Sequence, residues 1–312
     1  MVKKTKPNQT KTPRTKKAHE YKSFKLSKKI KPAGRKPLPG IVSLCKTAVV
    51  PFRLNKKLFL GIISIHLILT VIFVSGISSS IDFVDAKNNL EEAFGGDLGK
   101  FDSGLALFSY VLSSGSGADS VSANYQIFIS LITSLAIIWS IRQVLAGEKI
   151  NVRQSFYQGV YPLVPFMLVI FVIVLQLLPF LIGNFLVTTV IANGLAVSVI
   201  EKTLWWLIFA LLALLSLYMV LSSIFALYIS TLPDMAPLKA LRSARGLVLH
   251  RRVSIALRLI GLPIVVLSAY ALVLVPLIFI LPILVVPAFL LLGSFTLFFA
   301  HSYLYNLYRT LL

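Results

Sequence analysis

Long uninterrupted apolar segments constrain this chain more than any other feature of its sequence. Between Val160 and Leu312 most positions are hydrocarbon, and charged residues are confined to short intervals. A helix needs about 20 apolar residues to cross the ~30 Å hydrocarbon core of a bilayer. The 312 residues are 57% hydrophobic and 13% charged, whereas a soluble domain is usually ~45–50% apolar and ~25% charged. The sequence therefore predicts an integral membrane protein.

Six segments are long and apolar enough to be transmembrane helices. We expect an all-α fold, a polytopic helical bundle in which residues 41–312 form one membrane domain. Pro276, Pro282 and Pro287 crowd the short gap between the last two spans, which should form a tight hairpin, although 259–300 can be divided in more than one place. The predicted spans are 58–77, 123–143, 160–183, 203–229, 254–279 and 283–306.

The placement of charges predicts the orientation. Lys and Arg accumulate in cytoplasmic loops. With the N-terminus inside, the inner segments 142–159 and 230–258 carry three and six cations, whereas the outer loop 78–122 carries two cations against seven acids. We therefore expect a plasma-membrane protein with both termini in the cytoplasm, and we expect the acidic outer loop to be the place where a protein partner would bind.

The N-terminal segment has a different composition. Eighteen of the 31 Lys and Arg residues lie in residues 1–57, and residues 1–40 are rich in Lys, Pro and Thr without apolar periodicity. Such a segment should be disordered. Its expected partner is the anionic inner leaflet of the lipid bilayer. Nucleic acid is disfavoured as a partner, because the tail contains no recognisable RNA-binding module.

A second basic stretch, residues 237–262, interrupts the apolar half of the chain. One explanation is topological, since cations hold a loop in the cytoplasm. The spacing also suits a short amphipathic helix that begins near Asp234 and Pro237 and has Leu241, Ala244 and Val248 on one side. We expect this arm to bury its apolar side at the headgroup boundary and to present cations to anionic lipid. The cations of the predicted arm are Lys239, Arg242, Arg245, Arg251 and Arg252.

The same layout recurs before two other spans. Segments 41–60 and 147–166 are also short, mildly amphipathic and basic, and each leads into a hydrophobic span. The sequence therefore predicts three hairpins, each preceded by a cytoplasmic arm.

The run LPDMAPLKALRSARGLVLHRR joins an acid and a proline to Ala-Leu-Arg-Ser, Leu-Val and a basic pair. It resembles a loop in a loose superfamily of multi-pass bacterial membrane proteins. That group includes the membrane domain of some glycerophosphodiester phosphodiesterases and uncharacterised relatives without an enzyme. The resemblance implies a six-span bundle and no catalytic site, since the phosphodiesterase half has no counterpart here. The matching residues are Asp234, Ala240, Leu241, Arg242, Ser243, Leu247, Val248 and Arg252.

Few residues are candidates for catalysis, metal binding or proton transfer. Cys45 is the one cysteine, and the four histidines form no metal-binding motif, so we expect no cofactor and no metal. Ionisable groups inside a span are functional candidates by default, which singles out His66 and His301. These two side chains would face each other if the first and last spans were neighbours. Each imidazole then either bonds a carbonyl or a Ser hydroxyl in a packed interior, or belongs to a proton relay or a metal pair.

The fourth predicted span contains a row of small residues. Ser222, Ala226 and Ser230 recur every four positions. Rows of this kind let two transmembrane helices approach closely, so we expect helix packing along this row.

Three classes of function fit these features. The first is a non-enzymatic membrane protein that organises envelope or lipid through its basic arms and acidic outer loop. The alternative is a channel or transporter with a pathway near His66 and His301, although no Asp or Glu lies deep in a span. A membrane-embedded lipid enzyme is the third, and the absence of clustered acids or histidines disfavours it. The sequence leaves the oligomeric state open.

Overall fold

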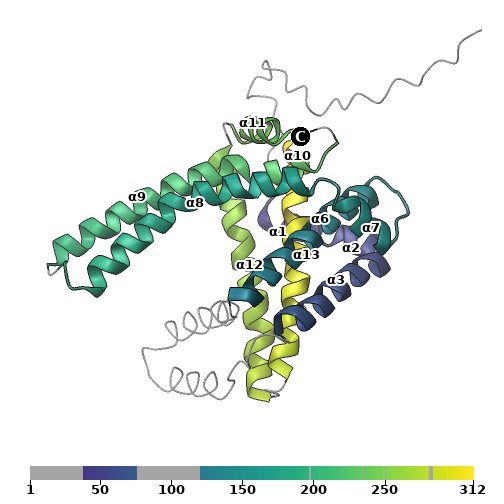
Figure 1. Ribbon diagram of the computed structural model, residues 1–312, viewed down its shortest axis with the longest axis horizontal. Coiled ribbons are helices and arrows are strands. Elements are labelled where there is room, and N and C mark those ends of the chain that lie inside the picture. Colours follow the sequence, from purple (N-terminus) through teal and green to yellow (C-terminus); the bar gives the residue numbers. More distant parts are fainter. Residues whose placement is uncertain (1–37, 76–119, 197, 234, 250, 281–283) are drawn as a thin grey trace, which may run out of the picture. The chain divides into compact units, whose positions relative to one another are not determined.

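The computed structural model describes residues 38–75, 120–196, 198–233, 235–249, 251–280 and 284–312 (Figure 1). Within these residues every regular element is a helix, which confirms the predicted all-α class. They belong to a unit that extends from Lys36 to Leu312. The predicted basic tail up to residue 37, most of the acidic loop and Asp234 lie outside the described residues.

Among the described residues, six helical stretches are apolar and long enough to cross a membrane, as the sequence predicted. They are built from α3 (Lys56–Thr70) with a π-helical end at Val71–Ser75, α6 (Ser120–Leu145), α8 (Leu163–Ala192), α9 (Val199–Ser223) with α10 (Ala226–Ser230), α12 (Arg252–Ile280) and α13 (Val285–Leu311). The protein is therefore a multi-pass membrane protein.

The three predicted hairpins, each preceded by an arm, are present in the order of the elements. Helices α1 (Ile41–Ala48) and α2 (Val50–Leu54) precede α3 and α6. Helix α7 (Val152–Gly159) precedes α8 and α9, and α11 (Pro237–Val248) precedes α12 and α13. The two spans within each hairpin pack against each other. An Asn151–Gln154 capping box starts α7.

The third span is longer than predicted. Its expected end at residue 183 is wrong, because α8 continues through Gly183 and Asn184 to Ala192. Gly183 lies against α9, where an added Cβ would be 3.1 Å from Leu212 and 3.2 Å from Phe209. The glycine therefore marks a close helix–helix contact and not a helix end. A capping box formed by Ser198 and Glu201 starts α9 soon afterwards.

Helix α13 holds the described core together. It packs against α1, α3, α6 and α12. The rings of Phe59 and Phe298 are 4.8 Å apart at the centre of a buried apolar cluster from three spans. We call it the apolar cluster, and its buried members are Leu58, Phe59, Ile62, Ile63, Ile137, Ile141, Val144 and Phe298.

The last two spans form the expected tight hairpin. The rings of Tyr270 on α12 and Phe289 on α13 are 5.8 Å apart. Further along, the Tyr303 hydroxyl donates to the carbonyl of Arg258 at 2.9 Å. Residues 281–283, between these two helices, lie outside the described residues.

The chain entering α1 is held by hydrogen bonds to these two helices. Arg258 donates from Nε to the carbonyl of Pro39 at 2.7 Å and from Nη2 to that of Leu38 at 2.8 Å. Ser302 donates to the carbonyl of Ala48 at 2.6 Å. Carbonyls beside and at the end of a short helix lack partners of their own, so these side chains fix the first arm on α12 and α13.

Replacing this arginine should loosen the first arm. We expect Arg258→Gln to increase amide hydrogen exchange across residues 38–48, because bonds from a charged donor contribute about 1.5–3 kcal/mol each. Exchange is measured by mass spectrometry on purified protein. Arg309→Gln, at an exposed position near the end of α13, is the control. Equal exchange in both variants would show that Arg258 does not hold the segment.

Candidate functional site

Helix α11 is the element that carries the basic stretch. Pro237 occupies its first turn, where no backbone N–H is needed, and the preceding Ala236 is extended. Positions separated by four, seven and eight residues lie on one side of a helix. That side contains the buried residues Ala240, Ala244, Leu247 and Val248, and the helix packs against α8, α9 and α10.

The apolar side of α11 was expected to lie at the lipid headgroup boundary, and this packing shows that it contacts protein instead. Ala244 and Val248 have no exposed surface, so they contact protein and do not enter the headgroup boundary. Leu241, the third residue of the predicted apolar side, is only half-buried. The alanines explain the difference, because small side chains let α11 approach its neighbouring helices closely.

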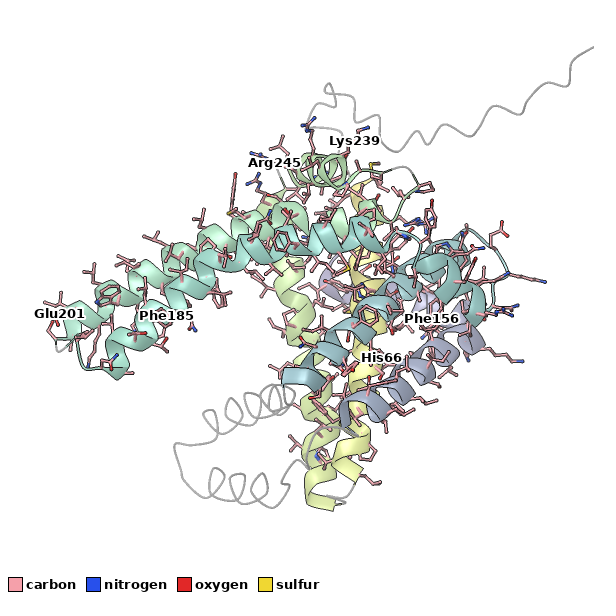
Figure 2. The ribbon with its side chains drawn as sticks, in the orientation of Figure 1. His66, Phe156, Phe185, Glu201, Lys239 and Arg245 are labelled. Carbon is pink, nitrogen blue, oxygen red and sulfur yellow. The ribbon has the colours of Figure 1, made fainter. Side chains whose placement is uncertain are left out.

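The opposite side of α11 is cationic. Lys239, Arg242 and Arg245 are exposed, and Figure 2 shows Lys239 and Arg245 projecting outward from the helix. Among the described residues the acids are Glu148 and Glu201, and neither lies on α11 or on the helical segments next to it in the chain. We call Lys239, Arg242 and Arg245 the cationic face. It is a fixed positive surface on a helix anchored to protein.

The other two predicted arm cations have different positions. Arg251 is half-buried in the turn after α11. Arg252 begins α12, and its guanidinium carbon lies 3.8 Å from the centroid of the Tyr218 ring on α9. This geometry is that of a cation–π contact. Arg252 therefore joins α12 to α9 and is not part of the cationic face.

The other arms also combine exposed cations with exposed apolar or aromatic groups. On α7 and just after it, Arg153, Tyr157 and Tyr161 are all exposed. On α1, Val42 and Lys46 are exposed. Tyrosine and long cationic side chains are typical of membrane–water interfaces.

His66 on α3 is packed inside the protein (Figure 2). Its Nδ1 lies 2.9 Å from Ser294 Oγ on α13. That hydroxyl also lies 3.0 Å from the carbonyl of Leu290; when it donates there, His66 Nδ1–H donates to Ser294 Oγ. The bond to a Ser hydroxyl is the packed arrangement predicted as one alternative.

His301 has another environment. Its Nδ1 lies 3.2 Å from the hydroxyl of Tyr228, where the sequence suggested a carbonyl or a serine. The ring of Tyr228 stacks on Tyr308 at 6.1 Å and lies 6.0 Å from Tyr305. Ser294, the partner of His66, is about 10 Å along α13 from His301. The expected face-to-face pair of histidines is therefore wrong, and each imidazole has its own partner.

The small-residue row is divided. A break after α9 separates Ser222 from Ala226 and Ser230, which lie on α10. Ala226 and Ser230 are buried, whereas Ser222 is half-exposed and donates to the carbonyl of Tyr218 in its own helix. The row therefore does not form one continuous packing surface.

Within the described ranges, no three His, Cys, Asp or Glu side chains gather as a metal site would require. Partial burial raises the pKa of the Cys45 thiol on α1 above its ordinary value, which leaves little reactive thiolate at neutral pH.

No known protein family matches the chain, and comparisons with curated proteins and with solved structures gave no match.

Proposed function

We propose that this protein is a non-enzymatic membrane protein that gathers anionic lipid headgroups at the cytoplasmic surface through the cationic face of α11. The observation that carries the proposal is the division of α11 into two sides. Ala240, Ala244 and Val248 are covered by protein, and the cationic face is exposed.

The anchoring of α11 favours binding. A disordered basic segment must lose conformational freedom when it binds, whereas a helix already packed on protein is preorganised. Each cation near an anionic membrane surface contributes about 1 kcal/mol. Three cations therefore attract anionic lipid with about 3 kcal/mol, an amount that decreases as salt screens the charges.

The other basic elements support the same activity. The cations and exposed aromatic residues of α7 are on the same side as α11 if all six helices cross the membrane. In the predicted orientation that side is cytoplasmic. The protein would then organise lipid or envelope on the inner leaflet, and its acidic loop would meet partners outside.

A channel or transporter pathway near His66 and His301 is the alternative. Because Ser294 and Tyr228 bond these two histidines separately, a pathway would pass each of them in turn and not through one shared site.

Lipid that remains bound after purification tests the proposal. We expect wild-type protein, extracted in mild detergent, to retain more anionic phospholipid than the triple variant Lys239→Gln, Arg242→Gln, Arg245→Gln. The expected difference shrinks when the wash contains high salt. Lipids are quantified by mass spectrometry.

A matched control removes three charges elsewhere. Lys87→Gln, Lys100→Gln and Lys202→Gln lower the net charge equally, in segments predicted to be outside. Retention should stay at the wild-type level in this control. Equal loss of lipid in both triple variants would mean that overall charge, and not α11, retains the lipid.

A further inference from the structure

The contacts between α3 and α6 set which residues lie opposite each other. At one end of this antiparallel pair, the rings of Phe73 and Tyr125 are 5.8 Å apart. Toward the other end, Ile62 and Ile63 pack with Ile137 in the apolar cluster. Because the two helices are antiparallel, residue numbers rise on one as they fall on the other. Counting from these two points places His66 on α3 at about the level of residue 133 on α6.

Four polar atoms on these two helices are buried without a hydrogen-bond partner among the described residues. They are Nε2 of His66, Oγ1 of Thr70, Oγ1 of Thr133 and Oε1 of Gln126. The exposed fractions of His66, Thr70 and Thr133 are only 4%, 6% and 1%. Buried polar atoms in folded proteins are nearly always paired with protein, ligand or water, so these atoms are candidates for contact with a bound molecule.

The spacing brings three of these atoms together. His66 and Thr70 are four residues apart on one side of α3, and Thr133 lies at the level of His66 on α6. Gln126 shares the side of α6 with Thr133 but is about 10 Å farther along the helix. Ile62 and Ile137, which lie on the same sides of α3 and α6 as His66 and Thr133, belong to the apolar cluster that the three helices share. Ser294 on α13 closes the group through its bond to His66.

Two further features are typical of a site. The π-helical turn at Val71–Ser75 starts directly after Thr70, and single π-helical turns are frequent at functional positions. In the other direction along α3, the apolar cluster fills the space between the three helices. The apolar cluster therefore separates these polar atoms from the end of α3 that is nearest the arms.

We propose that α3, α6 and α13 bind a small uncharged molecule that forms hydrogen bonds, of which water is the smallest, between His66, Thr70 and Thr133. In the tautomer whose Nδ1–H donates to Ser294, His66 Nε2 is an acceptor, and the threonine hydroxyls can donate or accept. An uncharged ligand fits because no Asp or Glu lies on the described parts of these three helices.

Oxidation by radicals generated from bound water tests the proposal in intact protein. X-ray radiolysis forms hydroxyl radicals where water lies, including inside a protein. We expect His66 to be oxidised several-fold faster than His301, whose Nδ1 is paired with Tyr228. Equal protection of the two histidines would show that no water is bound there, and the proposal then stands or fails on the stability of Thr133→Val.

A second measurement tests the case in which the bound molecule is a solute and not water. Thr133→Val keeps the shape of the side chain and removes the hydroxyl. If a ligand bonds that hydroxyl, the midpoint of thermal unfolding falls. If the hydroxyl is unpaired and dry, the midpoint stays or rises, and the proposal fails. The control is Thr203→Val, whose hydroxyl is exposed and bonds the carbonyl of Val199 in its own helix, with no change expected.

Native mass spectrometry distinguishes the two sources of the ligand. A bound solute adds its mass to the wild-type protein and not to Thr133→Val. Water leaves no added mass while the oxidation of His66 persists.

Discussion

Tyr228→Ala should lower the free energy of unfolding by about 3–5 kcal/mol, the range measured when a buried aromatic side chain is truncated. Tyr228 is almost fully buried on α10. Its ring contacts the rings of His301, Tyr305 and Tyr308 on α13. Truncation therefore leaves a cavity between α10 and α13. Unfolding is followed by helical circular dichroism during titration of mixed micelles with a denaturing detergent.

Tyr228→Phe separates packing from hydrogen bonding. It keeps the ring contacts and loses only the hydroxyl that faces His301 Nδ1 at 3.2 Å. We expect a loss of about 1 kcal/mol, the usual net value of one such bond. Equal losses for Tyr228→Ala and Tyr228→Phe would show that the hydroxyl bond, and not the ring cluster, joins α10 to α13.

Gly159→Ala is expected to destabilise the protein by about 1–3 kcal/mol, as overpacking of a close contact does. Gly159 ends α7 against α6. An added Cβ would lie 2.8 Å from the Cα of Ala136 and 3.1 Å from the carbonyl oxygen of Leu135. These are backbone atoms, which cannot rotate away as a side chain can, so α7 must shift.

Gly40→Ala is the matched control, because a Cβ at Gly40 meets nothing within 4 Å. The thermal midpoint in detergent should fall for Gly159→Ala and stay close to wild type for Gly40→Ala. A wild-type midpoint for Gly159→Ala would mean that α7 is not packed on α6 as closely as described.

The six spans could be predicted from the sequence because crossing a bilayer demands a long apolar segment, and hydropathy alone detects it. The end of the third span could not be predicted in this way. Gly183 and Asn184 interrupt the apolar run but not the helix. The pair Ser198 and Glu201, spaced as a capping box, was the signal that would have located the start of α9.

The contacts of the candidate sites were harder to predict, for a physical reason. Lipid tails and protein interiors are similarly apolar, so periodicity does not show which side of a transmembrane helix meets protein. The sequence singled out His66 and His301, but their partners Ser294 and Tyr228 lie far away in the chain. Thr70 and Thr133 were missed because a threonine in a span usually bonds its own helix.

On α11 the sequence correctly grouped Lys239, Arg242 and Arg245 opposite Ala244 and Val248. It did not reveal that α8, α9 and α10 cover Ala244 and Val248. This difference changes the proposed role, because the cationic face is fixed by protein packing and does not depend on lipid for its position.

Local lipid composition beside α11 tests the central claim most directly. A fluorophore is attached at Leu238→Cys, exposed at the start of α11, or at Ile200→Cys, exposed at the start of α9, in a Cys45→Ser background. Each protein is placed in bilayers that contain spin-labelled anionic or spin-labelled zwitterionic lipid. The ratio of quenching by the two lipids reports which lipid gathers near each position.

We predict a higher anionic-to-zwitterionic quenching ratio at position 238 than at position 200. The excess should disappear in the variant Lys239→Gln, Arg242→Gln, Arg245→Gln, and also at about 1 M salt, where the screening length falls to ~3 Å. Equal ratios at the two positions in wild-type protein at low salt would contradict the proposal that α11 gathers anionic lipid.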